Sequence, residues 1–110
     1  MTSSKSRRLE RSGWAIGSPT DFLGLTDEEA SFVELKLALA AGVRELREKQ
    51  GLTQTALATK LGSSQSRVAK MEAGDRSVSL DLLVRSLLSI GAGPSEIAKW
   101  IRRAETTRAA

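Results

Sequence analysis

The sequence contains no cysteine and no histidine among its 110 residues. Without cysteine there are no disulfides, thiolate metal clusters or cysteine nucleophiles, and without histidine the side chain that most often moves protons near neutral pH is missing. Aromatic residues are also few, with two Trp, two Phe and no Tyr. Stacking platforms for RNA or single-stranded DNA are therefore not expected. We predict neither a metal nor any other cofactor.

Long apolar runs are absent as well. No stretch of the sequence approaches the roughly 20 apolar residues of a membrane span, and no apolar run follows the basic N-terminal residues as it would in a secretory signal. We therefore expect a cytoplasmic protein with no membrane partner. The 17 Lys and Arg exceed the 13 Asp and Glu, which gives a net charge of +4 and favours a polyanionic partner.

The length suits one small domain with extensions. Residues 1–25 combine a polar, basic start with a Gly-rich but apolar segment that contains Trp14, Ile16, Phe22 and Leu23. We expect a basic tail and a partly irregular extension that packs on this protein's own helices, and the alternative is a docking segment for a partner protein. The domain proper is expected at residues 26–103, followed by a C-terminal tail at 104–110.

The domain opens with a capping box, Thr26-Asp27-Glu28-Glu29. The helix that it begins continues to about Lys49 and carries two apolar stripes, which predicts that the extension or a second subunit covers more than one of its sides. The first stripe contains Phe32, Leu35, Leu39, Val43 and Leu46, and the second contains Ala30, Val33, Leu37 and Ala41. Two i,i+4 charge pairs, Arg44 with Glu48 and Glu45 with Lys49, are predicted near its end.

Residues 52–74, LTQTALATKLGSSQSRVAKMEAG, predict two short amphipathic helices joined by a tight turn. Thr53 can cap the first helix, Gly62 can end it in a left-handed conformation, and Ser63 or Ser64 can cap the second. Two apolar residues of the second helix, Val68 and Met71, lie on its buried side. Its outer side is left with Gln65, Ser66, Arg67 and Lys70. Such a helix-turn-helix places its second helix in the DNA major groove.

The side chains on that outer face are of the types that read bases. Glutamine bonds bidentately to adenine, arginine and lysine bond to guanine, and serine bonds to bases or phosphates. The alternative is that this polar face is simply exposed to solvent and binds nothing. The tight turn between the two helices favours the DNA-binding interpretation. With few aromatic residues, the predicted nucleic acid is double-stranded DNA.

Two further helices complete an all-α prediction. Ser79 can cap an apolar helix through Ile90, and Gly91 to Pro94 break the chain before a last helix that ends at about Arg103. The apolar edge of the last helix is either a lid on the core or a dimer seam. The predicted fold therefore has five helices.

The stretch RELREKQGLTQTALATKLGSSQSRVAKMEAG, with the apolar helix after it, resembles the Cro and phage-repressor-like helix-turn-helix family, also called the XRE family. The resemblance covers roughly Leu39 to Leu88. It implies a lambda-repressor-like domain that binds double-stranded DNA, most simply a homodimeric transcriptional repressor on a palindromic operator.

The resemblance also implies roles for particular residues. Gln54 matches a glutamine that touches the DNA backbone and supports the reading helix, and Arg47 and Glu72 match an ion pair that locks the helix orientation. The predicted DNA-binding set is Gln54, Ser64, Gln65, Ser66, Arg67, Lys70, Arg76 and Ser77. Gln65, Ser66 and Lys70 fall at base-facing positions in this set, and Arg67 lies near the groove.

Other functions fit parts of the same sequence. The apolar extension and the basic last helix resemble antitoxins of the HigA type, which bind their own promoter and a toxin protein, and a protein-interaction module without DNA binding is a third possibility. An enzyme could use Ser64 or Ser66 with Lys70 as a nucleophile pair. Serine caps and an acidic first helical turn explain those residues better, so no catalytic residue is predicted.

Overall fold

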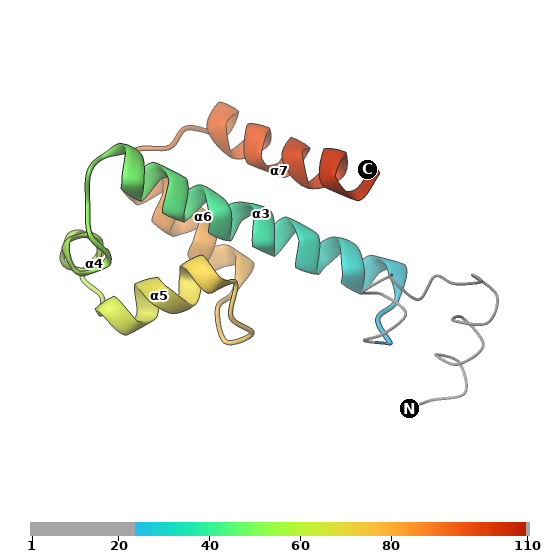
Figure 1. Ribbon diagram of the computed structural model, residues 1–110, viewed down its shortest axis with the longest axis horizontal. Coiled ribbons are helices and arrows are strands. Elements are labelled where there is room, and N and C mark those ends of the chain that lie inside the picture. The colour runs from blue at the N-terminus through green and yellow to red at the C-terminus, as the bar shows by residue number, and fades with distance from the viewer. Residues whose placement is uncertain (1–23, 110) are drawn as a thin grey trace. The chain divides into compact units, whose positions relative to one another are not determined.

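The computed structural model describes residues 24–109, with side chains through Ala104. Five α-helices and no strand occur in this range, which confirms the predicted all-α fold (Figure 1). They are α3 (Asp27–Lys49), α4 (Gln54–Leu61), α5 (Gln65–Ala73), α6 (Leu80–Ser89) and α7 (Pro94–Ala109). None of these described helices combines the length and the apolar character needed to cross a bilayer. The expected packing of Trp14, Ile16, Phe22 and Leu23 lies outside the described residues.

The predicted capping box begins α3. The backbone N–H of Thr26 donates to Oε1 of Glu29 at 2.8 Å, and the N–H of Glu29 donates to Oγ1 of Thr26 at 3.1 Å. The chain divides within this helix into two compact units, residues 1–34 and residues 35–110. In the first unit, Phe32 and Val33 are exposed on the helix. The two apolar stripes of α3 are therefore not buried along their whole length.

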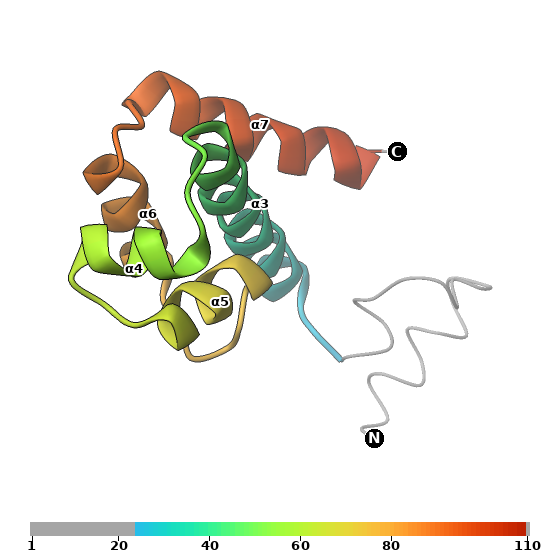
Figure 2. The ribbon, with the colours of Figure 1, turned by 60° about the vertical axis from the view of Figure 1, so that its left-hand side comes forward.

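The core of the second unit joins four helices. Fully buried side chains come from α3, α4, α5 and α6, at the helical spacings that the apolar residues follow in the sequence. The largest are Leu39, Val43, Leu57, Val68, Met71, Leu83 and Leu87. Figure 2 shows α4, α5 and α6 gathered on one side of α3. The polar faces of α4 and α5 are thereby left toward solvent.

The turn between α4 and α5 follows the local signals in the sequence. Oγ1 of Thr53 accepts from the N–H of Ala56 at 3.0 Å and caps α4, and Oγ of Ser64 accepts from the N–H of Arg67 at 3.1 Å and caps α5. Ser64, not Ser63, is therefore the cap. Gly62 ends α4 with φ +66°, a conformation that costs glycine no Cβ clash. Two helices are thus joined with only Gly62, Ser63 and Ser64 between them.

Helix α7 lies on the side of α3 away from α5 (Figures 1 and 2). Its Trp100 is buried against Gly42, where an added Cβ would come within 2.7 Å of the indole Cδ2. Of the two predicted roles for the apolar edge of α7, Trp100 therefore serves as a lid on the core, whereas Ile101 is exposed.

Two details of this region differ from the sequence prediction. Glu45 bonds to α7 and not to Lys49: its Oε2 accepts from Nη1 of Arg103 at 2.7 Å and from Nε1 of Trp100 at 3.2 Å. Helix α7 continues to Ala109 instead of ending near Arg103. The residues after Arg103 include no Gly or Pro that would stop a helix, so the predicted tail boundary at 104 is not a helix end.

Candidate nucleic-acid interface

The outward face of α5 is polar from its first turn. Val68 and Met71 are buried beneath it, which leaves Gln65, Ser66 and Lys70 exposed on the opposite side of the helix. The first turn of α5 contains no acidic residue. The partial positive charge at the start of the helix is therefore not offset by a carboxylate in that turn, which suits an anionic partner such as a phosphate.

A chain of hydrogen bonds connects this face with the interior. Nε2 of Gln65 donates to Oε1 of Gln54 at 2.7 Å, and Nε2 of Gln54 donates to Oε1 of Glu72 at 3.2 Å. Glu72 in turn accepts from Nε of Arg47 at 2.6 Å and from Nη2 of Arg47 at 3.0 Å. The structure thus brings four predicted site residues from α3, α4 and α5 into one network.

Most of this network is shielded from water. The side chains of Arg47 and Glu72 are 12% and 6% exposed, and Nη1 of Arg47 also donates to the backbone oxygen of Leu52 at 2.8 Å. The hydrogen bonds that Arg47 donates to Glu72 raise the pKa of the Arg47 guanidinium, against the opposing effect of burial. A bidentate pair of this kind has one preferred geometry, so it holds α5 and the start of α4 in a set orientation on α3.

The loop after α5 carries two more of the predicted contacts, Arg76 and Ser77, which are both exposed. Oδ2 of Asp75 accepts hydrogen bonds from the backbone N–H and the hydroxyl of Ser77. These bonds lower the pKa of Asp75. Nζ of Lys36 donates to the backbone oxygen of Arg76 at 3.4 Å. Lys36 was not predicted, because no local pattern links residues 40 positions apart.

The predicted residues do not all share one face. Ser64 is engaged as the helix cap, so its oxygen is already an acceptor for Arg67. The side chain of Arg67 lies on the flank of α5 toward α6, where it lines a cavity together with Arg85. Gln65, Ser66 and Lys70 therefore form the outward group, with Gln54 beside it and Arg76 and Ser77 in the loop beyond α5.

Residues 43–85 match a family model described as Helix-turn-helix. The match runs from the second half of α3 through α4 and α5 into α6, and it contains every residue of the hydrogen-bonded network. Comparison with curated proteins and comparison with solved structures each find no match.

Proposed function

We propose that this protein is a transcriptional repressor that reads a double-stranded operator with α5. The match of residues 43–85 to a helix-turn-helix family model supports this proposal. The observation that carries the proposal is the hydrogen bond from Gln65 to Gln54. This bond holds the Gln65 side chain, which can read adenine, at the exposed start of α5. The shielded ion pair of Arg47 with Glu72 orients that helix.

Each part of the site has a separate task in this proposal. Gln65, Ser66 and Lys70 contact base edges, with the glutamine suited to adenine and the lysine to guanine. Gln54 contacts the DNA backbone and keeps Gln65 in place, and Arg76 and Ser77 approach a phosphate from the loop. Phosphate contacts position the protein, while base contacts provide sequence discrimination.

We also propose that the protein acts as a symmetric dimer. One short recognition helix contacts only a few base pairs, whereas two related by a two-fold axis read half-sites about 34 Å apart on one face of the duplex. The operator is then a near-palindrome. Repression follows if this operator overlaps a promoter.

Selection of bound sequences from a random duplex library, followed by footprinting of the selected site, tests the proposal. We expect a near-palindromic consensus with two protected half-sites one helical turn apart. Protection without two-fold symmetry would exclude the symmetric dimer. A library from which no sequence is enriched would exclude sequence-specific DNA binding.

A second candidate is an antitoxin that binds both its promoter and a toxin protein. The observation in its favour is the exposure of Phe32 and Val33, 49% and 38%, on the helix that follows the apolar extension. Exposed apolar patches commonly mark protein–protein contacts. Co-purification with the product of an adjacent reading frame, abolished by Phe32→Ser with Val33→Ser, would support it. If the double variant still co-purified, Phe32 and Val33 would not contribute to toxin binding.

A further inference from the structure

A cavity of about 390 Å³ lies between α5 and α6, next to the turn that follows α4. It is lined on the flank of α5 that carries Arg67 and Met71, whereas the Glu72 network lies on a different flank of the same helix. Its volume falls in the range of small-molecule sites, about 300 to 1,000 Å³. The cavity is therefore a site separate from the outward group of Gln65, Ser66 and Lys70.

The lining combines an apolar floor with positive charge. Leu61 and Leu82 supply apolar surface together with the nearly buried Met71, while Arg67 and Arg85 supply two guanidinium groups. The remaining lining residues are Gly62 and three serines, Ser63, Ser86 and Ser89, so no carboxylate from the described part of the chain lines the cavity. A ligand with an apolar body and a negatively charged group complements both parts of this lining.

A buried hydroxyl inside the cavity wall points to the same ligand chemistry. Ser86 is only 5% exposed, and its hydroxyl donates to the thioether sulfur of Met71 at 3.4 Å. A thioether is a weak acceptor. An oxygen atom of a bound ligand would be a stronger acceptor for this hydroxyl.

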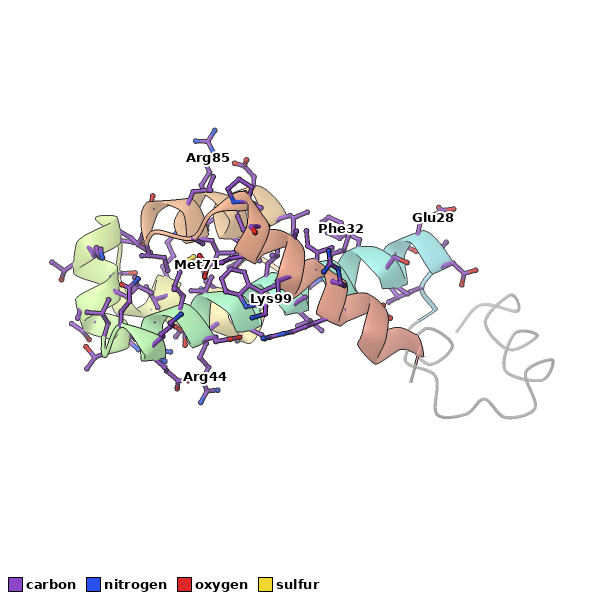
Figure 3. The ribbon with its side chains drawn as sticks, turned by 90° about the horizontal axis from the view of Figure 1, so that it is seen from above. Glu28, Phe32, Arg44, Met71, Arg85 and Lys99 are labelled. Carbon is purple, nitrogen blue, oxygen red and sulfur yellow. The ribbon has the colours of Figure 1, made fainter. Side chains whose placement is uncertain are left out.

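Arg85 lines the cavity, and its ion pair with Asp81 is exposed to solvent. Nε of Arg85 bonds to Oδ2 of Asp81 at 3.2 Å in an i,i+4 pair whose side chains are 78% and 75% exposed. Figure 3 shows Arg85 reaching away from the body of the protein, while Met71 lies inside it. An ion pair so exposed contributes little, so the guanidinium can exchange Asp81 for a ligand anion at small cost.

We propose that this cavity binds a small organic carboxylate. The carboxylate lies between Arg67 and Arg85, and the apolar body contacts Leu61 and Leu82. The cavity wall includes the turn before α5 and the flank of α5 that carries Arg67 and Met71. The binding site itself does not depend on the proposed operator function.

The test is an amide chemical-shift titration of the full chain with benzoate, and with benzamide as an uncharged compound of the same shape. We expect saturable shifts around Ser63, Arg67 and Ser86 with benzoate, and binding of benzamide that is at least about tenfold weaker, because hydrogen bonds to charged groups are the stronger ones. Absence of saturable shifts at these residues, or equal affinity for the two compounds, would overturn the proposal.

Two arginine variants test the charge requirement. Arg85→Ala should weaken benzoate binding about tenfold. The matched control is Arg44→Ala, which removes another arginine from an exposed i,i+4 pair, with Glu48 at 3.3 Å, on a part of the surface away from the cavity. The control should change the affinity less than about twofold, since exposed charges at a distance are screened by salt. If both variants weakened benzoate binding equally, the benzoate would be attracted by the overall positive charge of the protein, and the proposed site would be overturned.

A titration with DNA distinguishes a small-molecule carboxylate from a DNA phosphate as the anion that the cavity binds. A short duplex that carries the selected consensus is titrated into both arginine variants. If Arg85→Ala weakens duplex binding as much as benzoate binding, and the duplex displaces benzoate from the unaltered protein, the cavity holds a DNA phosphate and the small-molecule proposal fails. Unchanged duplex affinity of Arg85→Ala, together with tenfold weaker benzoate binding, supports it.

Discussion

Gln65 donates a hydrogen bond from Nε2 to Oε1 of Gln54, 2.7 Å away, across the turn that joins α4 to α5. The same Gln54 side chain donates to Glu72, so the exposed amide of Gln65 is two hydrogen bonds from the shielded carboxylate. A side chain held in this way loses less conformational freedom when it meets a base edge than one that rotates freely.

The first prediction separates base reading from positioning. Gln65→Ala and Lys70→Ala should each weaken binding to the selected operator by about 1 to 3 kcal/mol, with little effect on a random duplex, because base contacts are lost and phosphate contacts remain. Gln54→Ala should weaken binding to both duplexes. Fluorescence anisotropy at fixed salt measures these affinities. Equal losses on both duplexes for all three variants would contradict the division of roles.

The second prediction concerns the ion pair beneath the interface. Glu72→Gln leaves the Arg47 guanidinium, which is 12% exposed, without its counter-charge, and should lower the free energy of unfolding by about 3 kcal/mol. The control Glu48→Gln makes the same change in an exposed pair with Arg44 and should cost about 0 to 1 kcal/mol. Urea unfolding followed by circular dichroism provides both values. Similar costs for the two variants would show that the Arg47–Glu72 pair is no more important than a surface pair.

The third prediction tests how α7 is held on α3. Gly42→Ala places a Cβ 2.7 Å from Cδ2 of Trp100, and overpacking of this kind costs about 1 to 3 kcal/mol. Alanine is favoured over glycine within a helix by up to about 1 kcal/mol, so a net loss of about 1 kcal/mol is expected. Gly93→Ala is the control, because, apart from its chain neighbours, no atom of residues 24–104 lies within 4 Å of its added Cβ. Thermal unfolding compares them, and a stabilised Gly42→Ala variant would show that Trp100 moves aside without cost.

The fourth prediction is a dependence of stability on pH at the contact between α3 and α7. The hydrogen bond from Arg103 is the main cause that holds the pKa of Glu45 below its ordinary value of 4.5, with smaller contributions of the same sign from Trp100 and Lys99 and an opposing effect of burial. The ionised carboxylate therefore stabilises the fold above the unfolded pKa, and this contribution is lost as the pH falls through the lower folded-state pKa.

Thermal unfolding between pH 6 and pH 3 measures this contribution. Glu45→Gln and Arg103→Ala should each flatten the loss of stability below about pH 4.5 relative to the unaltered protein. Because both side chains are about half exposed, the flattening should shrink in high salt. A variant curve parallel to that of the unaltered protein would mean that other carboxylates account for the whole acid response.

Helix caps and helix faces were predicted well from the sequence, because they depend on residues three or four positions apart. Thr26 with Glu29, Thr53 and Ser79 cap the helices at the predicted places. The last helix was predicted too short, since a helix without Gly or Pro has no local signal for its end. The pairing of Arg47 with Glu72 was predicted from the resemblance to a known family, and not from the spacing of the two residues.

The sequence by itself determined where the helices begin, which faces are apolar and which polar side chains α5 presents, because backbone geometry and the hydrophobic effect act on near neighbours in the chain. Only the tertiary structure decided which distant side chains meet. Glu45 bonds to Arg103 in place of Lys49, Lys36 bonds to the loop at Arg76, and Arg67 faces the cavity that Arg85 lines. Each of these contacts depends on how two helices or a helix and a loop pack together, and that packing is set by the whole core at once.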